Sequence, residues 1–270
     1  MFDNQVTRQQ YGNVNLRDTD ILSDQPIQDS SLYHQYYNDF DDYVAANWTV
    51  TQIGAGTAPA LAAGDGGIIT MITGATAKNS ISNQKLFPSF STQLGVRFWG
   101  RIVFSVDSLL ANVIIGKTNS TTTPYTGGQI TDGVYLTTTG GTGVVKFNVA
   151  ASGTITTVTT TTSLVAGLGN YCRFSWYWDG GIYAAAPSGR VVCQVDGWPT
   201  LGGSGVTAPA RAEFGGSSAN ALPAGYPTAT NTTMQFDVQA NTAAARTMNV
   251  DMIQFTKERY NILTTPPVGL

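Results

Sequence analysis

The stretch SGTITTVTTTTSLVAG, residues 152–167, decides between a disordered tail and a folded surface. Seven of its first twelve residues are threonine. Branching at Cβ stiffens the threonine side chain and fits it to a pleated sheet, whereas disordered polar tracts favour Pro, Ser, Glu, Lys and Gln. Apolar residues interrupt the threonines, and Gly153 and Gly167 bracket them. The stretch therefore predicts a folded strand, bounded by turns, with a threonine-covered solvent face.

The same strand pattern recurs along residues 46–256, which we interpret as one β-rich domain. Apolar residues alternate with others in VRFWGRIVFSV (96–106), YCRFSWYWDGG (171–181) and RTMNVDMIQF (246–255). The predicted inward faces carry Val96, Phe98, Ile102, Phe104 and Val106, then Cys172, Phe174, Trp176 and Trp178, then Met248, Val250 and Met252. Gly and Pro clusters separate the segments, and no helical pattern of ten or more residues occurs. Many short strands predict an all-β sandwich or barrel.

Residues 1–45 read as an extended N-terminal arm and residues 257–270 as a C-terminal tail. Apolar side chains in DSSLYHQYYNDFDDYVAA (29–46) recur at spacings of three and four, which fits either a short amphipathic helix or an extended arm. Residues 1–44 hold eight Asp against two Arg, a net charge of −6, whereas the rest of the chain carries +3. The expected arm anchors at protein interfaces are Phe2, Tyr11, Leu16, Ile21, Leu22, Leu32, Tyr36, Tyr37 and Phe40.

The composition excludes several classes of function. Only 11% of the residues are charged, against about 25% in ordinary domains, which favours a surface that packs against neighbours in an assembly. No basic stripe exists for a nucleic acid. The first residues lack the apolar segment of a secretion signal, and no run is long enough to cross a membrane. We therefore expect Cys172 and Cys193 to be reduced, packed thiols, with a cross-strand bridge as the alternative.

No catalytic, cofactor or metal site can be assembled from the motifs. His34 is the single histidine, and beside three tyrosines it is more typical of packing than of chemistry. This removes Ser-His-Asp, Cys-His and His-zinc arrangements from the domain. No two carboxylates share a strand face at close spacing, although a hydrolytic pair assembled from separate strands stays open. Aromatic side chains that could stack on sugar rings are Trp99, Tyr177, Tyr183, Trp198 and Tyr226, with core or interface packing as the alternative.

The order of strands from residue 95 to 256, about 60% of the chain, is similar to that of concanavalin A-like lectin/glucanase jelly rolls. It particularly resembles versions found in virion proteins of tailed bacteriophages. Asp-Gly-Val-Tyr at 132–135 and Val-Asp-Gly at 195–197 carry most of the likeness. The Glu-x-Asp-x-x-Glu strand of the hydrolases and the metal-binding cluster of the legume lectins have no counterpart. The resemblance therefore implies a jelly-roll fold and a virion setting, and it transfers no catalytic or metal residues to this chain.

The resemblance and the composition together predict a non-enzymatic virion structural protein. The favoured hypothesis is a capsid decoration, or cement, protein made in the cytoplasm of a bacterial host. Its arm and tail would clamp the major capsid protein and sister copies on the capsid surface, in a homo-oligomer for which a trimer is one form. A head-fibre, tail or receptor-binding component with lectin-like carbohydrate binding is the alternative. A polysaccharide hydrolase is a third.

Overall fold

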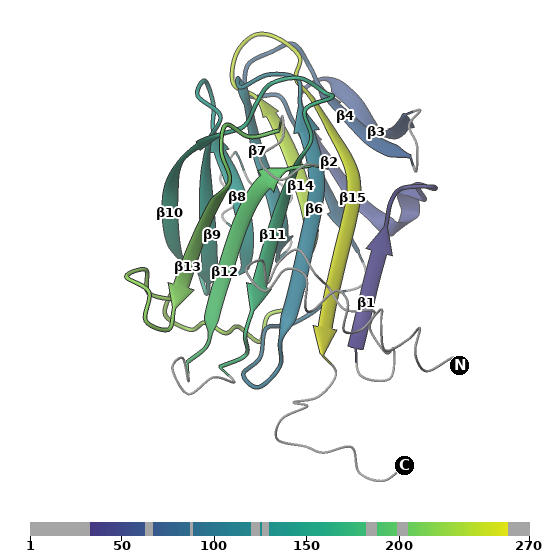
Figure 1. Ribbon diagram of the computed structural model, residues 1–270. Coiled ribbons are helices and arrows are strands. Elements are labelled where there is room, and N and C mark those ends of the chain that lie inside the picture. The colour runs from purple at the N-terminus through teal and green to yellow at the C-terminus, as the bar shows by residue number, and fades with distance from the viewer. Residues whose placement is uncertain are drawn as a thin grey trace, which may run out of the picture.

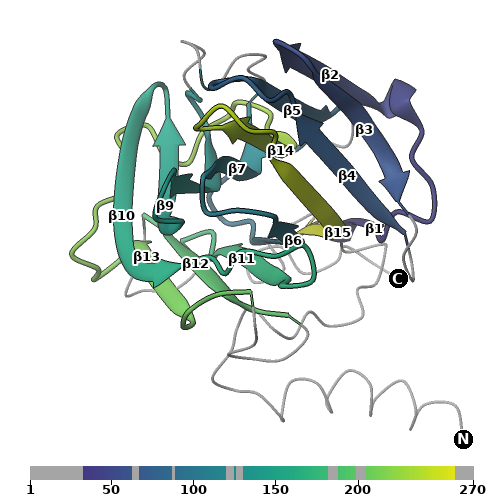
Figure 2. The ribbon, with the colours of Figure 1, turned by 90° about the horizontal axis from the view of Figure 1, so that it is seen from above.

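The computed structural model describes residues 33–62, 67–86, 89–119, 125, 130–181, 188–198 and 205–258, which form two antiparallel sheets packed face to face (Figure 1, Figure 2). Sheet A has the strand order β13-β12-β11-β6-β15-β4-β3, and β1 pairs with β15 beside this path. Sheet B has the order β10-β9-β8-β7-β14-β5-β2. The all-β class predicted from the alternation is confirmed, and of the two architectures that it allowed, a sandwich or a barrel, the chain forms the sandwich.

The strands of sheet A are β1 (Tyr33–Asn38), β3 (Gly56–Ala62), β4 (Ile68–Thr73), β6 (Phe98–Val106), β11 (Cys172–Trp178), β12 (Arg190–Gly197), β13 (Ala210–Gly215) and β15 (Thr247–Glu258). Those of sheet B are β2 (Trp48–Ile53), β5 (Ser80–Lys85), β7 (Ala111–Thr118), β8 (Gly133–Thr139), β9 (Val144–Ala151), β10 (Thr154–Ser163) and β14 (Thr233–Ala240). The 3-10 turn η1 (Ala45–Asn47) precedes β2. No helix in the described part of the chain has the length and apolar character needed to cross a membrane.

The core lies between the sheets and is built from the alternating residues of β6 and β11. Phe98, Ile102 and Phe104 of β6 and the four predicted residues of β11 point inward and are almost fully buried. Phe174 stacks on Phe147 of the facing sheet, with ring centroids 6.0 Å apart. Burial of so many aromatic rings supplies the main stabilising free energy of the sandwich, because each removes a large apolar area from water.

The threonine-rich stretch forms β10, at the edge of sheet B, and the strand prediction is confirmed. β10 pairs with β9 from Thr154 onward, and the register shifts between Thr159 and Ser163. The side chains of Thr157, Thr159 and Thr161 are exposed. Thr157 also donates its hydroxyl hydrogen to Asn148 Oδ1 at 2.8 Å. Threonine therefore serves here both as a β-former and as a polar, uncharged cover for an edge strand.

Residues 33–45 are integrated into the sandwich. β1 is extended and pairs with β15, from Tyr33 opposite Glu258 to Asn38 opposite Ile253. Phe40 follows with φ 60° and is fully buried, edge-on to Phe236 at 6.4 Å. Of the two conformations that the spacing allowed, the described part is extended. Residues 1–32, with the predicted anchors Phe2, Tyr11, Leu16, Ile21, Leu22 and Leu32, and residues 259–270 of the tail lie outside the described residues.

A lysine occupies the inner face of sheet B. The Lys117 side chain is buried, and its ammonium nitrogen lies 4.5 Å from the centroid of the Phe98 ring and 5.4 Å from that of Phe255. Burial, together with the charge of Lys257, lowers the pKa of Lys117 well below its ordinary value. The two rings offer the cation an attraction that partly offsets its lost hydration.

A buried polar network covers the outer face of sheet B around Asp237 on β14. Gln235 donates from Nε2 to Asp237 Oδ2 at 2.7 Å and to Ser82 Oγ at 3.2 Å, and Thr118 donates to Gln235 Oε1. Tyr125 donates its hydroxyl hydrogen to the Asp237 carbonyl oxygen at 3.1 Å. Burial raises the pKa of the Asp237 carboxyl to about 8. Burial therefore favours a protonated Asp237 at neutral pH, whereas the hydrogen bonds from Ser82 and Gln235 act in the opposite direction.

Gly100, in the middle of β6, tests the packing of the core. A Cβ atom there would lie 2.1 Å from Cζ2 of Trp176, whose side chain is fully buried. We predict that Gly100→Ala lowers the free energy of unfolding by about 1–3 kcal/mol, because the indole has no space to move into. Urea denaturation measures the change. Gly169→Ala is the control, since no atom lies within 4 Å of its added Cβ; equal losses in both variants would contradict the packing account.

Asp237→Asn tests the buried carboxyl through pH. The unfolded carboxyl ionises near pH 4, whereas the folded one does so at about 8. Because the folded pKa is the higher, the free energy of unfolding is greatest at low pH and falls as the pH rises from about 4 toward 8. Each tenfold difference in proton affinity between the two states corresponds to about 1.4 kcal/mol. Asparagine keeps an acceptor for Gln235 and does not titrate. We predict that Asp237→Asn is more stable than the parent at pH 8 and that this gain shrinks toward pH 4.

Urea denaturation at both pH values measures this difference. Glu213→Gln, on the outer face of β13, is the control for the loss of one carboxylate. A gain of the same size at pH 4 and pH 8 would show that Asp237 does not titrate as the burial requires.

Candidate functional site

A groove of about 430 Å³ opens on the outer face of sheet A over β15. Strand pairing sets its floor: Tyr37 of β1 lies opposite Gln254 of β15, which lies opposite Arg101 of β6. Directly opposed side chains on adjacent strands are neighbours. The groove thus combines aromatic, acidic, basic and amide groups, and its lining residues are Tyr37, Asp39, Arg101, Trp198, Asp251, Met252 and Gln254.

A β-bulge at Asp251 directs the side chains of Met252 and Gln254 into this groove. The register of β15 against β6 shifts between Val250 and Met252. Before the shift Val250 faces the core, and after it Ile253 faces the core, so Met252 points outward. The prediction that Met252 shares a face with Met248 and Val250 is therefore wrong, because the extra residue of a bulge reverses the alternation.

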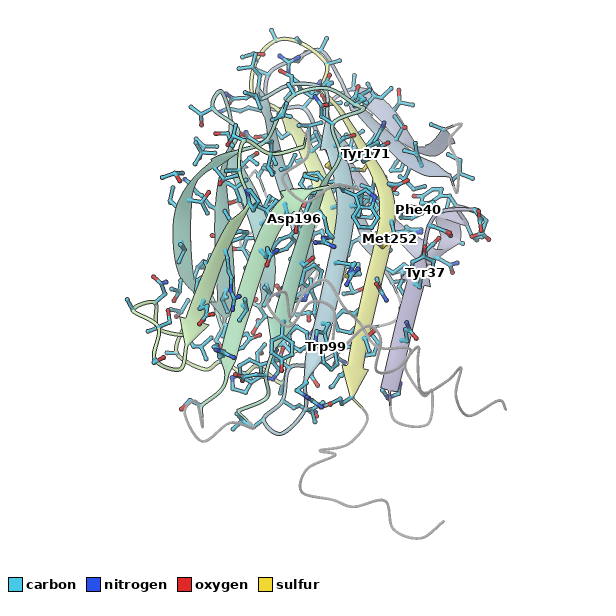
Figure 3. The ribbon with its side chains drawn as sticks, in the orientation of Figure 1. Tyr37, Phe40, Trp99, Tyr171, Asp196 and Met252 are labelled. Carbon is cyan, nitrogen blue, oxygen red and sulfur yellow. The ribbon has the colours of Figure 1, made fainter. Side chains whose placement is uncertain are left out.

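Two aromatic residues, Tyr37 and Trp198, line the groove at its two sides, and a third, Tyr171, lies close to Asp251. Tyr37 is 54% exposed, and Trp198 is half-buried. Trp198 donates its backbone N–H to the Tyr171 carbonyl oxygen at 3.0 Å. Figure 3 shows Tyr37, Met252 and Tyr171 on one face of sheet A. The groove therefore offers aromatic ring faces to a ligand.

A buried ion pair supports Trp198. The Arg173 guanidinium lies 5.5 Å from the Trp198 ring centroid. It also donates two hydrogen bonds to the Asp196 carboxylate, from Nε at 3.0 Å and from an Nη at 2.6 Å. Gln194 donates a further bond to Asp196 at 3.0 Å. This fork geometry fixes the guanidinium plane that lies beside the Trp198 ring.

Two carboxylates lie together in the groove. Tyr37 donates its hydroxyl hydrogen to Asp39 Oδ2 at 3.4 Å. Partial burial, followed by the charge of Asp39, raises the pKa of Asp251. Partial burial and the charges of Asp39, Asp251 and Asp41 raise the pKa of Tyr37. Asp39 follows β1, and Asp251 lies in β15, 212 positions later by residue number, so only the fold brings them into one groove. The sequence left open a carboxylate pair of this kind, assembled from separate strands.

The residues predicted to stack on sugars divide into three groups. Trp198 lines the groove. Trp99 and Tyr177 pack against each other at 5.6 Å on the outer face of sheet A and are 8% and 3% exposed, and Tyr226 is edge-on to Trp178 at 5.2 Å. These three buried rings present no open face, which corrects their assignment as stacking candidates. Tyr183 lies outside the described residues.

The predicted arm anchors that the structure describes also differ from one another. Phe40 packs in the core of its own domain, and Tyr36 packs against the same core with the Lys85 ammonium 5.4 Å from its ring centroid. Phe40 is fully buried and not available to a neighbouring protein, which corrects its assignment as an anchor. Tyr36 is only half-buried, so its role as an anchor stays a prediction. Tyr37 is exposed and belongs to the groove.

The remaining candidate groups have structural surroundings. The exposed His34 ring lies 6.0 Å from the ring of Phe90. Cys172 and Cys193 are buried free thiols, as expected, and burial raises the pKa of both. Within the described ranges, no group of three or more His, Cys, Asp or Glu side chains is placed to hold a metal ion.

Comparison with known proteins places the fold. No family model and no curated protein sequence matches the chain. Peanut lectin in complex with a nine-residue peptide superposes with a TM-score of 0.54 at 8% identity, over 83% of this chain and 97% of the lectin. Endo-1,3-beta-glucanase from Streptomyces sioyaensis gives 0.51 at 12% identity, over 87% and 99%. Lectin II from Ulex europaeus gives 0.51 at 10% identity, over 83% and 98%.

Sequence identities of 8–12% support a shared fold and do not transfer a function to this chain. Nothing in the comparisons points to a phage or virion origin. The chain is an all-β antiparallel sandwich with the concanavalin A-like lectin/glucanase jelly-roll fold.

Proposed function

We propose that this protein is a non-catalytic carbohydrate-binding protein whose ligand lies in the groove over β15. The observation that carries the proposal is the meeting of the exposed Tyr37 ring and the Trp198 ring with Asp39, Asp251 and Gln254 in one groove. Aromatic faces pack on the apolar faces of sugar rings, while carboxylate and amide groups bond to sugar hydroxyls. The volume of about 430 Å³ lies in the range of small-ligand sites.

The missing acid pattern supports binding over hydrolysis. The Glu-x-Asp-x-x-Glu strand that carries the acids of jelly-roll hydrolases has no counterpart in this sequence. Asp39, which follows β1, and Asp251 of the adjacent β15 line the groove together with Trp198, which follows β12. The two carboxylates can accept hydrogen bonds from sugar hydroxyls.

A glycan array followed by titration of the best ligand tests this function. We predict that Tyr37→Ala and Trp198→Ala each weaken binding tenfold or more, equivalent to about 1.4 kcal/mol, because each removes a ring face. Leu94→Ala is the control, since Leu94 is 56% exposed and does not line the groove. An array without hits would contradict the proposal. Release of reducing ends from a polysaccharide, lost in Asp251→Asn, would contradict its non-catalytic part.

A second candidate function is decoration of a tailed-phage capsid. The features that favour it are the low charge of 11%, the exposed threonines of β10 and the net charge of −6 in residues 1–44. In this proposal the segment before β1 binds the major capsid protein or sister copies in a homo-oligomer on the virion surface. A head-fibre, tail or receptor-binding location would unite this setting with carbohydrate binding.

Deletion of residues 1–32 tests the second candidate. A deletion to residue 44 would also remove β1 and the buried Phe40, so it would disturb the sandwich itself. We predict that the shorter deletion keeps the parent near-ultraviolet circular dichroism and loses binding to purified capsids, measured by cosedimentation. Phe40→Ala within the full chain, which weakens the core, controls for loss of stability. Undiminished binding by the deletion variant would contradict a role for this segment.

A further inference from the structure

The groove over β15 has a negative rim and a buried positive charge. Asp39 and Asp41 follow β1, Asp251 lies in β15, and all three act on the Tyr37 hydroxyl. The basic residue in the lining is Arg101 of β6, which is only 8% exposed. Arg173, nearby on β11, is already paired with Asp196. Solvent entering the groove therefore meets carboxylates before it meets a cation.

Among the residues that the structure describes, neither carboxylate of the lining, Asp39 or Asp251, takes part in an ion pair. Both are half-buried, so water screens their repulsion less than it would on an open surface. Partial burial raises the pKa of Asp251, and the charge of Asp39 raises it further. A bound cation would relieve this repulsion.

We infer, building on the proposed carbohydrate-binding function, that the groove selects glycans with free protonated amines, such as glucosamine oligomers, over neutral and acidic glycans. An ammonium group between Asp39 and Asp251 gains two charge-assisted hydrogen bonds. The rings of Tyr37 and Trp198 add a cation–π attraction when they lie within about 6 Å of the charge. A uronic acid in the same place would bring a third carboxylate against the first two.

Oligomers that differ only in N-acetylation give the sharpest test. Glucosamine pentamer and N-acetylglucosamine pentamer share length and linkage, and only the first carries free amines. Calorimetric titration at pH 6 is expected to show at least tenfold tighter binding of the glucosamine pentamer, and no binding of a galacturonate pentamer. Asp39→Asn and Asp251→Asn should each reduce the preference to threefold or less. Glu213→Gln, which removes a carboxylate from β13 of the same sheet, should leave it unchanged.

The outcomes separate the two proposals. Equal affinity for both pentamers, or tight binding of a neutral glycan alone, would overturn the amine preference and leave carbohydrate binding standing. A preference that survives in the double variant Asp39→Asn/Asp251→Asn would also overturn it, because the charge would then come from elsewhere. Binding of no glycan on an array or in titration would overturn both proposals. Loss of the preference as pH falls and Asp251 becomes protonated would support it further.

Discussion

One inserted residue, Asp251, determines what sheet A can present to the outside. β15 pairs with β6 along most of its length, and its first half also pairs with β4 and its second half with β1. Without the shift at Asp251, the alternation that buries Met248 and Val250 would also bury Met252 and Gln254 and expose Ile253 and Phe255. The bulge lets both halves of the strand bury their apolar residues while the second half turns polar groups outward. The groove follows from that reversal.

The same strand also explains why residues 33–45 belong to the domain. β4 ends its pairing with β15 at Val250, which leaves the edge of the second half open, and β1 covers it from Ile253 to Glu258. An open apolar edge strand is a site for aggregation. Phe40 then enters the core beside Trp48 and Phe236 and holds β1 in place. The segment that supplies Tyr37 and Asp39 to the groove is thus also the cover of the sheet edge.

Local pattern sufficed for the regular parts of the fold and failed where distant segments meet. β6 and β11 alternate strictly, so their inner and outer faces could be read from the sequence. β1 could not, because its aromatic residues recur at spacings that suit a helix equally well, and its pairing partner lies more than 200 residues away. Alternation leaves Trp99 and Tyr177 outside the inward set, where the structure has them, but their burial against each other depends on packing that alternation does not encode. Asp39 and Asp251 line the same groove only because β1 pairs with β15 and because β15 carries a bulge at Asp251, and neither feature is encoded in a local pattern.

The scarcity of charge makes the location of each charged group informative. Several of the described charged residues sit in compensated places: Arg173 pairs with Asp196, Arg97 with Glu258, and Lys117 lies between aromatic rings. Asp237 is buried with a pKa near neutrality, so it avoids a full charge by holding its proton. Asp39 and Asp251 are two half-buried carboxylates in an aromatic groove, without an ion-pair partner among the described residues, and this arrangement costs stability. A ligand that brings a positive charge between the two carboxylates would relieve their repulsion, so the same arrangement that destabilises the free protein favours binding.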